Sequence, residues 1–175
     1  MISGNASKPK LRILIVDDDK GWREILSDVV SRKFLESESA DKYELELVVI
    51  EPGEGEGKHM EGRKYIERAR DVLRAGGIHG ALIDWNVGDQ GDIFIPKEDK
   101  VYTGELLKEV YGMRIPLIAV TGSGKSFTNF EAQLMEQGIG LDSIRKNTVS
   151  TSDPIFQQFI EGAISLCDQE LKGGY

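Results

Sequence analysis

Four short segments, three of them strongly apolar, restrict the fold of this chain more than any other feature of its sequence. Segments of this kind are typical of strands buried on both faces of a parallel sheet. The segments and the polar residues that follow them are 11–16 with Asp17, Asp18 and Asp19, 80–83 with Asp84, 116–120 with Thr121, and 141–145 with Lys146. The carboxyl ends of parallel strands lie side by side, at the edge of the sheet where ligands bind. The sequence therefore predicts a functional site at that edge.

Amphipathic helices are predicted between the strands. The first of them is indicated by apolar residues that recur at helical spacing, namely Trp22, Ile25, Leu26, Val29 and Val30. The predicted strands are 11–16, 43–50, 81–84, 117–120 and 141–145, and the predicted helices are about 22–35, 63–75, 104–111 and 127–137, with a last one that starts near 153–154. This alternation predicts an α/β fold, a five-stranded doubly wound parallel sheet with helices on both faces.

The length and charge of the chain limit its class. A chain of 175 residues corresponds to about one domain. We expect a flexible N-terminal arm over 1–10 and a single domain over 11–175, with extended loops near 51–62 and 88–103. The net charge of −8 argues against nucleic acid as a direct partner, and no apolar run approaches the ~18 residues that a membrane span needs. A single cysteine, Cys167, fits a reducing compartment, so we expect a cytoplasmic protein.

Four motifs at the predicted strand ends resemble those of a known family. They are Ile-Leu-Ile-Val-Asp-Asp-Asp at 13–19, Leu-Ile-Asp-Trp-Asn at 82–86, Ala-Val-Thr-Gly at 119–122, and Lys146. In order and spacing they resemble the receiver domain of two-component response regulators, including the chemotaxis receiver. The resemblance implies a flavodoxin-like sheet with the strand order 2-1-3-4-5. It also implies a phosphoacceptor signalling domain, which catalyses only its own phosphorylation and dephosphorylation and is not an enzyme in the usual sense.

The resemblance assigns a role to each acidic residue. Asp84 would be the phosphoacceptor and a metal ligand, because a carboxylate can hold a phosphoryl group as a mixed anhydride. Asp18 would bind Mg²⁺ (or Mn²⁺) directly, Asp17 would bind it through water, and the backbone carbonyl of Asn86 would complete the protein ligands. Asp19 is predicted to cap the following helix and not to bind the metal.

The resemblance also assigns the two remaining residues of the site and the partners. Thr121 would donate its hydroxyl to one phosphoryl oxygen, and Lys146 would pair with another as a point charge. The phosphodonor would be a sensor histidine kinase or a histidine phosphotransfer protein. No DNA-binding segment follows the last predicted helix, so we expect the signal to pass to a downstream protein by direct contact.

Three departures from the family pattern leave a second function open. Asn147 replaces the proline that usually follows the lysine, Ser143 replaces a common aromatic residue, and Gly88 replaces the proline expected after the acceptor. An insertion around 89–102 separates the acceptor from the next helix, and we expect it to let Asp89 and Asp92 approach the metal. The chain could therefore be a receiver-like interaction module that works without phosphate.

Two enzyme classes remain as weaker alternatives. Residues 119–126, Ala-Val-Thr-Gly-Ser-Gly-Lys-Ser, fit a relaxed P-loop pattern, but no later strand ends in the metal-binding aspartate that a P-loop NTPase would need. A haloacid-dehalogenase-type phosphatase would use Asp17 as nucleophile, together with Asp19, Thr121 and Lys146. That class needs a further acidic motif after the lysine, and it leaves Asp84 without a role.

Overall fold

The computed structural model describes residues 7–52, 62–87, 101–122 and 125–173. Most of the predicted N-terminal arm, at 1–6, therefore lies outside the described residues, as do 53–61 and 88–100 from the two predicted extended loops. Within the described part of the chain, no helix combines the length and the apolar character that crossing a membrane requires.

A five-stranded parallel sheet forms the centre of the molecule. Its strands, in the order in which they lie side by side, are β2 (Glu44–Val49), β1 (Lys10–Val16), β3 (Gly80–Asp84), β6 (Leu117–Thr121) and β7 (Asp142–Arg145). All four neighbouring pairs are parallel. Since β6 and β7 are the fourth and fifth strands of this sheet, the predicted order 2-1-3-4-5 is confirmed.

Two further short strands were not predicted. They are β4 (Asn86–Val87) and β5 (Val101–Tyr102), which form a separate antiparallel pair between β3 and the next helix. Two-residue strands leave no periodicity in the sequence, so pattern analysis could not detect them.

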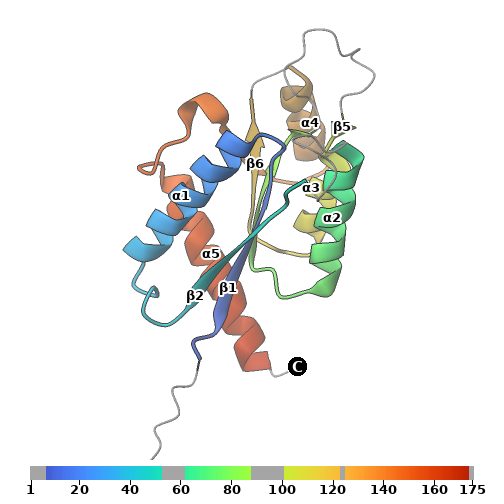
Figure 1. The fold of residues 1–175 in the computed structure, drawn as a ribbon. Helices are drawn as coiled ribbons and strands as arrows, with labels where there is room; N and C mark the ends of the chain where they lie inside the picture. Colours follow the sequence, from blue (N-terminus) through green and yellow to red (C-terminus); the bar gives the residue numbers. More distant parts are fainter. Residues whose placement is uncertain (1–6, 53–61, 88–100, 123–124, 174–175) are drawn as a thin grey trace, which may run out of the picture.

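Helices cover both faces of the sheet (Figure 1). One face carries α1 (Lys20–Glu36) and α5 (Pro154–Gly173), and the other carries α2 (Gly62–Ala75), α3 (Gly104–Gly112) and α4 (Lys125–Glu136). Each face has its own hydrophobic cluster. Ile13 and Ile15 of β1 pack with α1 and α5, whereas Leu14 and Val16 pack with α2 and α3. This burial on both faces explains why the strand reads as a continuous apolar run.

The buried face of α1 differs from the prediction at Trp22 and Ile25. Trp22 is only half-buried and belongs to neither hydrophobic cluster. Leu26, Val29 and Val30 are buried as expected, but Ile25 remains 43% exposed. Arg23 is buried instead, with only 7% of its surface exposed. A charged side chain is buried at this cost only where it finds strong hydrogen-bond acceptors, and Arg23 finds them at the end of β1.

Candidate functional site

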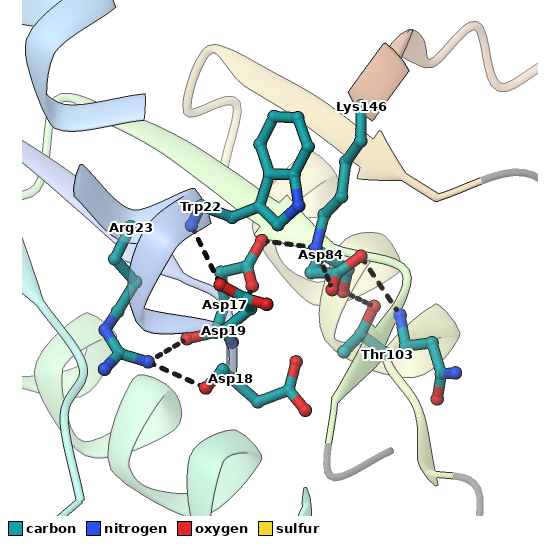
Figure 2. Close-up of polar contacts among 9 residues, drawn as sticks. Asp17, Asp18, Asp19, Trp22, Arg23, Asp84, Thr103 and Lys146 are labelled. Atoms are coloured by element: carbon teal, nitrogen blue, oxygen red, sulfur yellow. Dashed lines mark hydrogen bonds and ion pairs between the residues drawn. The ribbon is translucent and has the colours of Figure 1, made fainter. Parts of the chain in front are cut away.

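The predicted acidic residues come together at the carboxyl edge of the sheet. Val16 lies opposite Ile83 in the register of β1 and β3, so Asp17 and Asp84 follow at the same level. Asp17, Asp18 and Asp84 each contribute one carboxylate oxygen to a group whose members all lie within 4.8 Å of one another. All three residues are buried. Figure 2 shows their side chains together with that of Lys146. The sequence prediction that these strand ends meet is confirmed by this geometry.

Lys146 reaches the acidic group from the end of the edge strand β7. It begins the short 3₁₀ helix η2 (Lys146–Thr148) directly after β7, which β6 separates from β3. Its Nζ donates a hydrogen bond of 2.8 Å to Oδ2 of Asp84. The same Nζ forms an ion pair with Oδ2 of Asp17, also at 2.8 Å. One ammonium group therefore contacts two buried carboxylates.

Thr121 and Asn86 lie beside this group. Thr121 ends β6 and is buried, one residue beyond Val120, which pairs with Asp84 across the two strands. The backbone N–H of Asn86 lies 3.5 Å from Oδ1 of Asp84, at the weak limit of a hydrogen bond. Beside Thr121, and leaving aside the chain neighbours of Gly122, no atom of the described residues lies within 4 Å of the position that a Cβ at Gly122 would take. The roles of Thr121 and of the Asn86 carbonyl stay predictions.

Burial and mutual repulsion change the titration of the site. Burial, followed by the negative charge of Asp17, raises the pKa of Asp84, and Lys146 only partly opposes this. Burial also raises the pKa of Asp17 against the opposing effect of Lys146. For Lys146, burial alone lowers the pKa, but the charges of Asp84 and Asp17 outweigh it and the pKa is raised. The site therefore holds more negative charge than its single lysine can neutralise.

The donor atoms of the site fit a hard divalent cation. Asp17, Asp18 and Asp84 provide carboxylate oxygens, which Mg²⁺ and Mn²⁺ prefer, and they provide few of them, which suits an ion that keeps several waters. Their excess negative charge is also what a cation would relieve. The residues present thus fit the metal that the resemblance implies.

Asp19 has the structural role that was predicted for it. Its Oδ1 accepts a hydrogen bond of 3.1 Å from the backbone N–H of Trp22, which caps the start of α1. Its own N–H donates to Oδ1 of Asp17 at 2.9 Å. Asp19 thus fixes both the helix and one oxygen of its acidic neighbour.

Two residues that support the site were not found from the sequence. Arg23 donates from Nη1 to the backbone carbonyls of Asp17 and Asp18, at 2.8 and 2.9 Å. Thr103, which is fully buried, donates from Oγ1 to the backbone carbonyl of Asp84 at 2.7 Å. Thr103 directly precedes a predicted helix, a position that suggests a cap, but its hydroxyl donates to Asp84 and makes no cap hydrogen bond. Nothing in the sequence distinguishes Arg23 from an ordinary surface arginine.

Trp85, whose environment the sequence did not decide, is buried. Its ring lies 5.3 Å from that of Phe127 and 4.7 Å from that of Phe130, between centroids, both on α4. Its backbone carbonyl accepts a hydrogen bond from the N–H of Thr103. The residue that follows Asp84 is therefore packed against α4 and is not free to act as a surface contact.

The departures from the family pattern have structural counterparts. Ser143, where receivers commonly have an aromatic residue, donates from Oγ to Oε1 of Glu131 on α4 at 3.1 Å. Asn147 lies in η2, and every peptide bond in the described ranges is trans. Gly88, Asp89 and Asp92 fall outside the described residues, so their predicted approach to the site stays a prediction.

A solved structure shows which fold this is. The signal receiver domain of an HD domain-containing protein from Pseudomonas fluorescens matches with a TM-score of 0.55 at 14% sequence identity, over 94% of this chain and 95% of that chain. This chain has the receiver-domain fold. The resemblance seen in the sequence is thus confirmed at the level of the fold.

Two other structures align over nearly the whole receiver fold with lower scores. The phosphorylated cyanobacterial phytochrome response regulator RcpA gives a TM-score of 0.46 at 18% identity, over 97% of this chain and 98% of that chain. An orphan response regulator of H. pylori gives 0.44 at 10% identity, over 89% of this chain and 95% of that chain. No known protein family and no curated protein sequence matches this receiver-fold chain by sequence.

Proposed function

We propose that this chain is a response-regulator receiver that accepts a phosphoryl group on Asp84. The observation that carries the proposal is the set of contacts around this carboxylate. Asp84 is buried beside Asp17 and Asp18, its Oδ2 accepts a hydrogen bond from Lys146, and its backbone carbonyl is fixed by Thr103. A carboxylate held in this way is both positioned and kept from ordinary solvation, as a phosphoacceptor requires.

The transfer itself needs no proton from the protein. An oxygen of Asp84 forms a new bond to phosphorus, and the bond from phosphorus to the leaving group breaks. The leaving group takes the bonding electron pair, and Asp84 becomes a mixed anhydride. Lys146 then pairs with a phosphoryl oxygen in place of the carboxylate, and the hydroxyl of Thr121 donates to a second one. Gly122, which has no side chain, leaves the approach open to the incoming group.

The carboxylates of Asp18 and Asp84 and the backbone carbonyl of Asn86 would hold Mg²⁺ or Mn²⁺, with Asp17 bound through water. When bound, the cation neutralises the charge that would otherwise repel an anionic phosphodonor. The raised pKa of Asp84 and of Asp17 is consistent with this assignment, because burial, and for Asp84 also the charge of Asp17, disfavours carboxylates that a bound cation would stabilise.

The donor and the output follow from the same proposal. The donor is a sensor histidine kinase or a histidine phosphotransfer protein, and the phosphorylated domain acts by contact with a downstream protein in the cytoplasm. The domain covers 11–175 and catalyses only its own phosphorylation and dephosphorylation. The net charge of −8 supports a protein partner over nucleic acid.

One observation favours a second candidate, a receiver-like interaction module that works without phosphate. Ser143 forms a hydrogen bond with Glu131 of α4 and offers no aromatic ring that could move when Thr121 engages a phosphoryl group. The two enzyme classes are weaker. A phosphatase with Asp17 as nucleophile does not account for Asp84, and a P-loop NTPase does not account for the acidic group at β1 and β3.

The test is phosphorylation by a small donor. We expect intact mass spectrometry, after incubation with Mg²⁺ and acetyl phosphate, to show a single acid-stable, base-labile phosphoryl adduct on the wild-type protein and none on Asp84→Asn. Asp41→Asn, which removes an exposed carboxylate in the turn before β2, is the matched control and should be labelled normally. Labelling that survives Asp84→Asn but not Asp17→Asn would favour the phosphatase. An unlabelled wild-type protein that still binds Mg²⁺ would favour the phosphate-independent module.

A further inference from the structure

Lys146 has a third neighbour besides its two carboxylates. Its Nζ lies 5.4 Å from the centroid of the Trp22 ring, within the range of a cation–π contact. Figure 2 shows the indole beside the end of the lysine side chain, next to Asp17. Only 12% of the Lys146 side chain is exposed. The ammonium group is therefore enclosed by Asp17, Asp84 and an aromatic face.

The cap at the start of α1 holds the backbone of Trp22 beside the site. The backbone N–H of Trp22 donates to Oδ1 of Asp19 in the helix cap, and Asp19 in turn is tied to Asp17. Trp22 is half-buried, yet it belongs to neither of the two hydrophobic clusters of the described core. A large aromatic side chain that does not pack in the core, and that faces the lysine of the site, is better explained by the site than by folding.

The aromatic face of Trp22 gives Lys146 a contact that does not compete with metal or phosphoryl binding, as the carboxylates do. The oxygens of Asp17 and Asp84 are also the proposed ligands of the metal and of the phosphoryl group, so their contacts with the lysine change when either binds. The ring attracts the ammonium through its quadrupole and offers no oxygen that could compete for a divalent ion. Without such a contact, the flexible four-carbon chain of lysine would be free to leave the site.

We propose that Trp22 is a positioning residue for phosphorylation, which acts by holding the ammonium group of Lys146 at the Asp84 carboxylate. This inference rests on the proposed phosphoacceptor function and adds to it a residue that the receiver motifs do not include. Trp22 does not touch the reacting atoms and acts only through the lysine.

The contact itself can be observed by NMR without any phosphorylation. A methylene group over an aromatic ring is shifted upfield by the ring current. We expect the ε-methylene protons of Lys146 to resonate upfield in the wild-type protein and to return to the ordinary lysine position in Trp22→Leu. Lys146→Met, which loses the signal, assigns it.

The functional test is a double-mutant cycle on the rate of labelling by acetyl phosphate with Mg²⁺. A cation–π contact of about 0.5–2 kcal/mol corresponds to a rate effect of roughly 2- to 30-fold, so Trp22→Leu should slow labelling by a factor in that range. Trp22→Phe, which keeps a ring of weaker quadrupole, should be slowed less. In the Lys146→Met background, the difference between Trp22 and Leu at this position should vanish. Ile25→Ala, one turn along α1 and exposed, is the control for altering this helix.

The outcomes separate this inference from the function on which it rests. An absent upfield shift would overturn the contact. Equal labelling of the wild type and Trp22→Leu, or an equally large effect of Trp22→Leu without Lys146, would overturn the positioning role and leave the proposed function intact. A wild-type protein that is not labelled at all would contradict the proposed function, and the positioning role with it.

Discussion

Asp84 and Asp17 are held in an environment that disfavours their charge. They are 4% and 0% exposed, and each repels the other across the end of β1 and β3. Lys146 is the cationic side chain that contacts both carboxylates. The metal-free protein is therefore less stable than it would be without one of these charges. This loss of stability follows from burying several carboxylates together, as a binding site for a cation requires.

We predict that Asp84→Asn stabilises the metal-free protein at alkaline pH. The folded state raises the pKa of Asp84 from 3.8 to about 7, because burial and then Asp17 disfavour the charged form. The folded protein thus binds this proton more tightly than the unfolded chain does. The stability that this tighter proton binding contributes is complete at pH values below the pKa of Asp84 in the unfolded chain. It is lost as the pH rises through about 7, the pKa of Asp84 in the folded protein.

At pH 8 in EDTA, the unfolding free energy of Asp84→Asn from urea titration should exceed that of the wild type by about 1–3 kcal/mol. The difference should shrink toward pH 4. Asp41→Asn, an exposed carboxylate, should change stability little at either pH. A variant that is less stable than the wild type at pH 8 would show that the pairing with Lys146 outweighs the burial of charge.

Arg23 should be as important to the folded state as a core residue. Its Nη1 donates to the carbonyls of both Asp17 and Asp18, and its removal leaves these carbonyls without a buried charged donor. We expect Arg23→Met to lower the unfolding free energy by about 2–4 kcal/mol and to weaken Mg²⁺ binding. Arg23→Lys, which can reach one carbonyl, should lose less. Arg32→Met, on the exposed side of the same helix, is the control, and equal losses in both variants would exclude a specific role for Arg23.

At the scale of elements, the approach of α5 to β3 depends on a glycine. A Cβ at Gly80 would lie 2.7 Å from Cζ of Phe159 and 2.9 Å from Cδ1 of Ile13, both of which are buried. Neither neighbour can move without disturbing the packing of α5 on the sheet. The first residue of β3 therefore sets how closely the helix and the strand pack.

We predict that Gly80→Ala destabilises the protein by about 1–3 kcal/mol in urea unfolding. Gly140→Ala is the matched control and should be tolerated, because among the described residues, its chain neighbours aside, no atom lies within 4 Å of its Cβ position. Phe159→Leu, which removes the nearest ring atoms, should recover part of the loss in the double variant. A Gly80→Ala protein as stable as the wild type would mean that α5 can shift at little cost.

The whole molecule should respond to metal, because the proposed ligands come from the ends of different strands. A cation that binds only the folded arrangement stabilises it by mass action, by about 2.7 kcal/mol at 100 times Kd. For a chain of this size we therefore expect saturating Mg²⁺ to raise Tm by roughly 5–10 °C in a thermal melt. Asp18→Asn should lose this increase, whereas Asp41→Asn should keep it. An equal increase with the same ionic strength of NaCl would indicate screening and not binding.

Much of this architecture could be predicted from the sequence because it depends on local patterns. The buried strands are marked by apolar runs, and the connecting helices by helical periodicity, within two residues of their observed ends. The parallel topology then places Asp17, Asp18, Asp84 and Thr121 at one edge without any knowledge of packing. Asp19 as a helix cap also follows from its position in the chain.

The sequence by itself thus determined the fold class and which residues could form the acidic site. The tertiary structure alone decided the contacts between side chains from distant segments: Lys146 with two carboxylates, Trp22 over that lysine, and Ser143 with Glu131. The tertiary structure also decided that Arg23, and not Ile25, is buried on α1. Periodicity records only whether a position is apolar, whereas a buried polar side chain is selected by the acceptors that the fold brings to it.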